Sequence, residues 1–377
     1  MQQTSKPIRV GILGLGRSGF GIHAKAIAAF CQNPTIQPPF SLAAIFDADA
    51  ARLQETAHHL SCRAARSAAE LYNDPEVDLI VVATPNRFHF PHALAALQAG
   101  KHVLCEKPFT TSTAEVDQLI AAAAKAGKLI QPFQQRRYEH DFQKIRAVIA
   151  SGSLGEIVFV RTCWHSFKRR WDWQTISSLS AGELLNNGPH PIDHALWLFD
   201  GNDGSDPALP LPQVWCERRH TLCTGDAEDH VKIILSGPGR PTIDIEISSA
   251  VAFSQDRWLI CGTRGGLKGN ADSLEWKYAD FATLPSRPLP PTTEFEQSTP
   301  DRSYNGEQLP WQTDTWKIAG SGDGGAGAPP AIQPVLDLYT DLHAAIRLGK
   351  PQVITPQSVR RRVAVIEQCI KLAPVIR

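Results

Sequence analysis

The chain has 377 residues, of which 42% are hydrophobic and 20% are charged, as is typical of folded globular proteins. This length predicts two domains whose cores need no disulfide or metal support. Lysine plus arginine and aspartate plus glutamate both total 38. No overall charge therefore favours nucleic acid or an anionic membrane surface as a partner, and no apolar run reaches the roughly 18 residues that span a bilayer.

The eight cysteines are scattered along the chain, and no two of them form a C-x-x-C pair. Zinc ribbons and dense disulfide frameworks need clustered cysteines, so we expect free thiols, no metal site and a reducing compartment. The chain enters an apolar stretch at Ile8 without a signal-peptide pattern. We therefore expect a cytoplasmic protein.

The first third of the chain alternates apolar stretches with alanine-rich helical patterns. Strands are predicted at 8–13, 41–46, 77–83 and 102–105, and helices at 23–30, 48–60, 90–99 and 113–126. Strands that alternate with helices of this length indicate parallel β-α-β units. Residues 1–132 are therefore predicted to form an α/β domain of the Rossmann type.

The pattern changes after residue 133. A helix at 141–151 precedes strands at 157–164, 231–235, 243–251 and 257–261; a helix at 183–199 interrupts them, and helices at 335–348 and 356–372 close the chain. Successive strands favour an antiparallel sheet. We predict an α+β domain with a mostly antiparallel sheet over 133–333. The helices of 334–377 are expected to pack back on both domains.

Two short stretches of biased composition are expected to be structural only. Residues 318–330 are rich in glycine and are predicted to be a flexible linker. The three consecutive arginines at 360–362 are predicted to form a solvated helix face.

A glycine-rich turn follows directly after the first predicted strand, with the sequence Gly14-Leu15-Gly16-Arg17-Ser18-Gly19. This is the G-x-G-x-x-G spacing between a strand and a helix that a dinucleotide requires. The first glycine permits a tight turn, the second lets the backbone approach a pyrophosphate, and the third allows close packing of helix and strand. Arg17 and Ser18 stand at the helix end whose free N–H groups attract phosphate, so both are expected cofactor contacts.

Asp47 ends the second predicted strand. An acidic residue at this place hydrogen-bonds the adenosine ribose hydroxyls and repels the 2′-phosphate of NADP. NAD is therefore the expected cofactor and NADP is less favoured, although Arg17 keeps NADP open because its cation attracts a 2′-phosphate. A further glycine, Gly21, indicates that the helix after the turn begins late, near Ile22.

Two motifs resemble the Gfo/Idh/MocA oxidoreductase family, which includes glucose-fructose oxidoreductase and the inositol dehydrogenases. The first is Thr84-Pro85-Asn86-Arg87-Phe88-His89, and the second is Gly100-Lys101-His102-Val103-Leu104-Cys105-Glu106-Lys107-Pro108. The resemblance continues through Gly188-Pro189-His190-Pro191-Ile192-Asp193 to Gly349-Lys350-Pro351. It implies a Rossmann domain followed by a substrate-binding domain over 133–333 with a large open sheet, whose outer face forms homodimers or homotetramers.

The resemblance also implies the positions of the cofactor contacts. Thr84, Pro85 and Asn86 are expected to line the nicotinamide end of the site, with His89 of the same motif also near the cofactor. Glu106 and Lys107 are expected beside the nicotinamide ribose and the substrate.

Oxidation of an alcohol needs a hydride acceptor, a base for the hydroxyl proton and a positive group near the developing alkoxide. Lys107 is expected to stabilise the alkoxide and to relay its proton. His190 is the expected acid/base, because its ordinary pKa lies near neutral pH. Relatives with this motif usually carry an aspartate where this chain has Asn186, which cannot raise the histidine pKa but can still bind a substrate hydroxyl.

Further substrate contacts are expected from Arg136, which follows the last Rossmann strand, and from Trp171, in a segment rich in tryptophan and cations. Asn186 and Asp193 complete the expected set; Asp193 alternatively holds His190 or caps a helix. The predicted function is hydride transfer between NAD(H) and a hydroxyl or keto group of a sugar, inositol or related polyol. Two alternatives stay open: an enzyme that retains NAD and cleaves glycosides by oxidation and elimination, and an NAD-binding sensor without catalysis.

Overall fold

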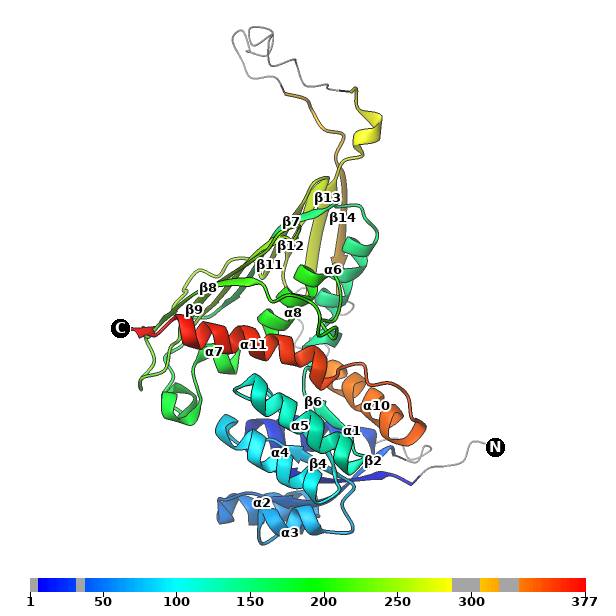
Figure 1. The fold of residues 1–377 in the computed structure, drawn as a ribbon, viewed down its shortest axis with the longest axis vertical. Coiled ribbons are helices and arrows are strands. Elements are labelled where there is room, and N and C mark those ends of the chain that lie inside the picture. Colours follow the sequence, from blue (N-terminus) through cyan, green and yellow to red (C-terminus); the bar gives the residue numbers. More distant parts are fainter. Residues whose placement is uncertain (1–5, 32–37, 287–305, 319–331) are drawn as a thin grey trace.

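The computed structural model describes residues 6–31, 38–286, 306–318 and 332–377, which form two β-sheets (Figure 1). Sheet A is parallel, with the strand order β3-β2-β1-β4-β5-β6. Its strands are β1 (Ile8–Leu13), β2 (Phe40–Phe46), β3 (Arg63–Ala64), β4 (Leu79–Val82), β5 (His102–Cys105) and β6 (Ile130–Pro132). This order confirms the predicted Rossmann-type α/β fold.

The helices of sheet A connect successive strands, as parallel pairing requires. They are α1 (Lys25–Phe30), α2 (Ala50–Leu60), α3 (Ala68–Asn73), α4 (His89–Gln98) and α5 (Thr113–Ala126), and a π-helical stretch, η1 (Gly19–Ala24), precedes α1. The Ser112 side chain caps α5 by accepting the N–H of Glu115, and Gly127 ends it in the left-handed conformation. These two local signals explain why the predicted bounds of α5 agree with the structure.

Sheet B has the strand order β14-β13-β12-β11-β7-β10-β9-β8-β15 and is antiparallel except at the pairs β10–β7 and β15–β8. Its strands are β7 (Ile157–His165), β8 (Gln213–Arg219), β9 (His230–Ser236), β10 (Thr242–Ser248), β11 (Trp258–Gly262), β12 (Gly265–Gly269), β13 (Ser273–Tyr278), β14 (Gln312–Lys317) and β15 (Val375–Ile376). The predicted large, mostly antiparallel open sheet is therefore confirmed.

Sheet B is covered by helices on one face, where α6 (His140–Ala150), α8 (Pro189–Asp200) and α11 (Pro356–Leu372) lie (Figure 1). Phe142, Ile192 and Ile366 from these helices belong to one buried cluster with strand residues of the sheet. Trp215 and Leu259 point to the opposite face and are 53% and 37% exposed.

The helix predicted over 183–199 is two helices, α7 (Glu183–Asn186) and α8. Pro189 and Pro191 lack the N–H that a continuous helix needs at those positions. A Cβ on Gly188 would also collide with the backbone carbonyl of Leu184. The prediction of one continuous helix was therefore wrong, and the break places His190 in the first turn of α8.

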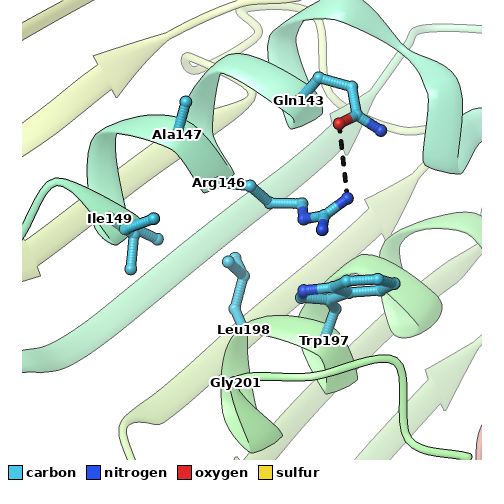
Figure 2. A pocket seen from close by; sticks show the side chains of 8 residues that line it. Gln143, Arg146, Ala147, Ile149, Trp197, Leu198 and Gly201 are labelled. Atoms are coloured by element: carbon cyan, nitrogen blue, oxygen red, sulfur yellow. Dashed lines mark hydrogen bonds between the residues drawn. The ribbon is translucent and has the colours of Figure 1, made fainter.

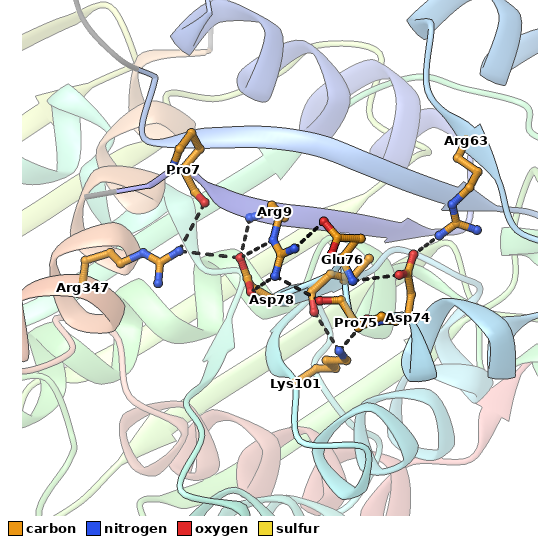
Figure 3. A network of polar contacts seen from close by, with 10 residues as sticks. Pro7, Arg9, Arg63, Asp74, Pro75, Glu76, Asp78, Lys101 and Arg347 are labelled. Atoms are coloured by element: carbon orange, nitrogen blue, oxygen red, sulfur yellow. Dashed lines mark hydrogen bonds and ion pairs between the residues drawn. The ribbon is translucent and has the colours of Figure 1, made fainter. Parts of the chain in front are cut away.

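The closing helices α10 (Gln333–Leu348) and α11 contact both sheets. Tyr339 of α10 is buried in the core beside sheet A, and Arg347 reaches Pro7 O (3.2 Å) and Asp78 (3.6 Å) at the amino ends of its strands (Figure 3). In α11, Arg361 and Arg362 are only 6% and 1% exposed. The prediction of a solvated arginine face was therefore wrong for these two residues, because α11 lies between the two sheets.

The predicted glycine-rich linker lies outside the described residues except for Ile318. Within the described ranges, no helix has the length and apolar character needed to cross a bilayer.

Candidate active site

The glycine turn after β1 uses its three glycines for different reasons. Gly14 has φ of +91°, and a Cβ there would lie 2.6 Å from the Ala83 carbonyl oxygen. A Cβ on Gly19 would collide with the carbonyl oxygen of Gly14. A Cβ on Gly16 would meet nothing within 4 Å. The protein's own packing thus requires glycine at 14 and 19, whereas the space above Gly16 suits a ligand that approaches the backbone.

The helix after this turn begins at Arg17, and its first i to i+4 bond joins Phe20 N to Gly16 O at 3.0 Å. The expectation of a late start near Ile22 was wrong. Gly21 lowers helix stability by about 1 kcal/mol but does not prevent the helix. Arg17 and Ser18 therefore lie in the first turn, which presents free N–H groups to an anion.

Asp47 follows the last residue of β2 and is held beside the glycine turn. Its Oδ2 accepts the N–H of Leu15 at 2.7 Å, and its Oδ1 accepts the N–H of Asp49 at 2.9 Å. Arg52 lies 3.6 Å from Asp47 and 3.4 Å from Asp49. Two carboxylates face one half-exposed guanidinium, so the local charge is negative.

The loop after β4 forms the opposite wall, because β4 pairs with β1 and the carboxyl ends of the two strands meet. A cavity of about 240 Å³ opens there, lined by Arg17, Ser18, Ala83, Thr84, Pro85, Asn86, His89, Glu106, Lys107, Arg170, Asp172, Trp173 and Gln174. Thr84 Oγ1 and His89 Nδ1 are buried without a hydrogen-bond partner among the described residues. Buried polar atoms of this kind indicate a ligand that completes their bonding.

His89 and Asn86 are fixed by the bonds that they do make. His89 Nε2 lies 2.9 Å from Thr84 O, and Asn86 Nδ2 donates to Ser180 O at 2.7 Å. Burial lowers the pKa of His89 to about 4, so its imidazole is neutral near pH 7.

Lys107 follows β5 and borders both this cavity and a second one. The second cavity measures about 480 Å³ and is lined by Arg17, Ser18, Gly21, Ile22, Lys25, Glu106, Lys107, Phe133, Gln135, Arg136, Asn187, His190, Ile332 and Val335. Lys107 Nζ donates to Asn186 O at 2.8 Å and to Asn186 Oδ1 at 3.2 Å. Burial lowers the pKa of Lys107 to about 8, against the raising effect of Glu106. Lys107 can therefore gain or lose a proton near neutral pH.

His190 faces the second cavity from the first turn of α8. Its ring stacks on Trp164 with 5.8 Å between ring centroids, and its Nδ1 is buried without a partner in the described part of the chain. Burial and the nearby cations Arg136 and Lys107 lower the pKa of His190 well below its ordinary value. The imidazole is consequently neutral. Asn186 and His190 were expected on one helix face, but they belong to separate helices, and Asn186 Oδ1 accepts a hydrogen bond from Lys107.

Arg136 lines the same cavity as expected. Its guanidinium lies 4.7 Å from the Trp164 ring centroid and forms an ion pair with Glu139. Gln135 also faces the cavity, and its Oε1 is buried without a described partner. Motif reasoning missed Gln135 because a glutamine after a short strand carries no distinctive pattern.

Three expected substrate contacts line neither cavity: Asp193, Trp171 and Asn186, whose side chain accepts from Lys107. Asp193 accepts two hydrogen bonds of 2.7 Å from the buried guanidinium of Arg137, so its carboxylate is already paired and neither holds His190 nor faces the cavity. Trp171 is 81% exposed and lines neither cavity. A buried arginine needs a counter-charge, which explains the position of Asp193.

A buried bridge that the sequence did not indicate joins the Lys107 loop to the His190 turn. Arg362 of α11 donates to Pro108 O at 2.8 Å and to Gln134 Oε1. Gln134 Nε2 in turn donates to Pro189 O at 3.2 Å. Helix α11 thus sets the position of the loop that carries Lys107 relative to the first turn of α8, which carries His190.

A third cavity, of about 450 Å³, lies between α6 and α8 away from these groups (Figure 2). Arg146 stacks on Trp197 there, with 3.9 Å from the guanidinium carbon to the ring centroid. None of the predicted site residues lines it, so we do not assign the candidate site to this cavity.

Comparison with known proteins gives matches over most of the chain. Residues 8–134 match an oxidoreductase family with an NAD-binding Rossmann fold, and residues 142–268 match the GFO/IDH/MocA C-terminal domain. The chain is 31% identical over 284 residues to the uncharacterized oxidoreductase YdgJ of Escherichia coli K12. The aligned region covers 74% of this chain and 77% of YdgJ.

A second relative has a named activity, and a solved structure shares the fold. The chain is 31% identical over 200 residues to scyllo-inositol 2-dehydrogenase (NADP(+)) IolW of Bacillus subtilis, covering 51% of this chain and 52% of IolW. An NAD-binding protein from Listeria innocua superposes with a TM-score of 0.74 at 21% identity, over 97% of this chain and 95% of that protein.

Proposed function

Because the chain belongs to the GFO/IDH/MocA family of NAD(P)-binding oxidoreductases, we propose that it interconverts a hydroxyl and a keto group of a sugar, inositol or related polyol. The observation that carries this proposal is that Lys107 and His190 line one cavity beside the glycine turn. A cavity of about 480 Å³ has room for a monosaccharide-sized substrate. The inositol substrate named for the relative IolW supports a polyol.

The residues around the glycine turn fit a dinucleotide. The open space above Gly16 admits the pyrophosphate, Asp47 suits the ribose hydroxyls, and Thr84 and His89 keep unpaired atoms toward the adjoining cavity. When bound, the nicotinamide supplies the acceptor for the hydride that leaves the carbinol carbon. We favour NAD because the carboxylate of Asp47, which is held against the glycine turn, repels a 2′-phosphate, although the relative IolW is named for NADP.

We assign the proton transfer to Lys107. In the oxidation direction, the hydroxyl proton passes to Lys107 Nζ as the carbonyl forms, and in reduction it returns. The pKa of about 8 suits this role, whereas the strongly lowered pKa of His190 makes it a weak base near pH 7. The neutral His190 instead donates a ring N–H to the substrate oxygen, where negative charge develops. This division differs from the expected acid/base role of His190, because burial and two nearby cations disfavour the imidazolium.

We also propose that the outer face of sheet B joins copies of the chain into a homodimer or homotetramer. Trp215 and Leu259 on this face are exposed, and a second copy of the chain that packs on this face would cover them. Light scattering of the purified protein measures the assembly, and a monomer would contradict this part of the proposal.

The function is tested by following NADH formation across a panel of free sugars, inositols and glycosides, with NADP in a parallel series. We expect turnover with at least one polyol and loss of that turnover in Lys107→Ala. Release of an aglycone without net NADH would instead indicate glycoside cleavage through a transient keto sugar. Tight NAD binding without turnover on any member of the panel would overturn the proposal and favour a sensor.

A further inference from the structure

Three buried side chains form a hydrogen-bonded chain beneath Lys107. His23 lies in η1, Glu106 follows β5, and Tyr339 lies in α10. His23 Nε2 is 3.3 Å from Glu106 Oε1, and His23 Nδ1 is 2.9 Å from Tyr339 Oη. His23 and Tyr339 are fully buried and Glu106 is 3% exposed, so water does not compete for these bonds.

The protonation states of this chain follow from its chemistry. Burial acts to raise the pKa of Glu106, but the hydrogen bond from His23 and the nearby Lys107 keep it below its ordinary value. Glu106 is therefore a carboxylate and can only accept, so His23 Nε2 carries the hydrogen. Tyr339 keeps its hydroxyl proton, because burial raises the pKa of the phenol well above the ordinary value. Its hydroxyl and His23 Nδ1 form the second bond of the chain, which fixes the orientation of the imidazole ring.

Glu106 connects this chain to the reacting lysine. Its Oε2 accepts the backbone N–H of Lys107 at 3.0 Å, and its charge acts to raise the pKa of Lys107. Glu106 also borders both cavities. A displaced or protonated Glu106 would therefore change both the backbone position and the charge environment of Lys107.

We propose that His23 is a positioning residue of this site, which holds Glu106 as an anion against the backbone of Lys107, while the Tyr339 hydroxyl fixes the orientation of the His23 ring. The π-helical stretch η1 places His23 under the loop, and such stretches are frequent at functional sites. The inference rests on the proposed function only in the proton-transfer role of Lys107. It predicts that Tyr339 of α10, which lines neither cavity, adjusts the chemistry of the site.

Other charged or titratable groups also face Lys107, and they are unchanged in the test. They are Arg17 at the start of the helix after the glycine turn, His89 of α4, Arg136 after β6, Glu183 of α7 and His190 of α8. Among the described residues, none of these groups is a hydrogen-bond partner of His23, whose ring contacts Glu106, Tyr339 and Phe133. Replacement of His23 therefore acts on Lys107 through Glu106.

The experiment measures the rate at which a small acylating reagent modifies Lys107 in the full-length protein between pH 6 and 10, by mass spectrometry of the peptide that contains it. This readout needs no substrate. We expect the midpoint near pH 8 for the unchanged protein to fall by roughly one unit in His23→Phe, because Glu106 loses its donor and its negative charge. His23→Gln keeps a donor and should restore most of the midpoint, and Tyr339→Phe should give a smaller shift in the same direction.

The pair Tyr72 and His92 provides a matched control, because it is a second tyrosine–histidine hydrogen bond in the same domain between α3 and α4. His92→Phe should leave the Lys107 midpoint unchanged. An unchanged midpoint in folded His23→Phe, or an equal shift in His92→Phe, overturns the inference. If His23→Phe does not fold, Tyr339→Phe decides, since it removes one oxygen atom, and an unchanged midpoint there overturns the inference as well.

The two proposals fail in different ways. Absence of turnover on the polyol panel would overturn the proposed function and leave the Lys107 midpoint measurable. A shifted midpoint in His23→Phe supports the positioning role whether or not a polyol is the substrate.

Discussion

The amino ends and the carboxyl ends of the strands of sheet A carry similar types of polar residue, but these residues differ in whether the chain itself supplies their hydrogen-bond partners. At the amino ends of the strands, Arg9 bonds to Asp78 at 2.9 and 3.1 Å and to Glu76 at 2.6 Å, and Lys101 Nζ donates to the carbonyls of Asp74 and Val77 (Figure 3). At the carboxyl ends, buried polar atoms without described partners line the two cavities; they belong to Thr84, His89, Gln135 and His190.

This difference distinguishes a structural network from a binding site. A buried polar group without a partner destabilises the fold by about 1–3 kcal/mol, so four such groups beside two cavities indicate a molecule that completes their bonding. At the amino ends of the strands, the polar groups find their hydrogen-bond partners within the chain. At the carboxyl ends, the hydrogen-bond donors and acceptors that line the cavities remain available to a cofactor and a substrate.

Lys107 at the carboxyl ends of the strands and Lys101 at the amino ends give the largest expected difference in kcat/KM. Lys107→Ala should lower kcat/KM for the active polyol by roughly 10²–10⁴, because the proton loses its acceptor, while NAD binding persists. Lys101→Ala should lower thermal stability through the loss of two hydrogen bonds and leave kcat/KM within roughly twofold. Steady-state kinetics and thermal denaturation separate these effects, and near-normal turnover in Lys107→Ala would remove Lys107 from the mechanism.

Substitutions at two glycines test whether the carboxyl ends of the strands of sheet A bind the dinucleotide. Gly16→Val has room in the structure, so it should fold normally but lose the stabilisation by NAD, which amounts to about 2.7 kcal/mol at 100 times Kd. Gly306→Val, at another glycine with open surroundings, should keep that stabilisation. Differential scanning fluorimetry with and without NAD measures both, and an intact NAD response in Gly16→Val would contradict the cofactor assignment.

The acidic end of the cofactor site should decide the choice between NAD and NADP. Asp47→Ser removes charge repulsion and should shift the affinity ratio toward NADP by roughly tenfold, or about 1.4 kcal/mol. Asp49→Ser should leave the ratio nearly unchanged and keep α2 capped, because serine can also accept the N–H of Arg52. Titration of both nucleotides gives the ratios. A native protein that already prefers NADP would refute the role of Asp47 and direct attention to Arg17.

The smallest expected effect is a displaced pH profile. Oxidation requires neutral Lys107, so kcat/KM should be low below the pKa of about 8 and rise as pH increases through it. Asn186→Asp places a carboxylate beside Lys107 Nζ, which favours the ammonium form and should move the rise upward by roughly one pH unit. The exposed change Asn73→Asp serves as control. A rise centred below pH 7 in the native protein would contradict the assignment of the proton to Lys107.

Local signals account for the parts of the fold that were predicted well. The bounds of α5 and α11 agree with the structure, and both helices have a side chain that caps the first turn. The short elements β3, α3 and β6 were missed, because two to six residues do not establish a periodic pattern. The break between α7 and α8 was missed although Pro189 and Pro191 marked it.

The candidate site was predictable where a motif is continuous in the chain. The glycine turn, Asp47 and Glu106-Lys107 needed only local sequence, because a strand, a tight turn and a helix start follow from neighbouring residues. Gln134 and Arg362 were not predictable, because their partners come from other elements. An arginine run within a helix has the same local pattern whether it faces solvent or the space between two sheets.

The sequence by itself determined the alternation of strands and helices, the glycine turn and the residue types at the carboxyl edge of sheet A. Only the tertiary structure decided the partners of the predicted polar groups: Asn186 accepts a hydrogen bond from Lys107, whereas Asp193 is paired with Arg137. It also decided the partners of His23, which lie 83 and 316 positions away in the sequence. Hydrogen bonds over such separations depend on the packing of whole helices and sheets, which no local pattern records.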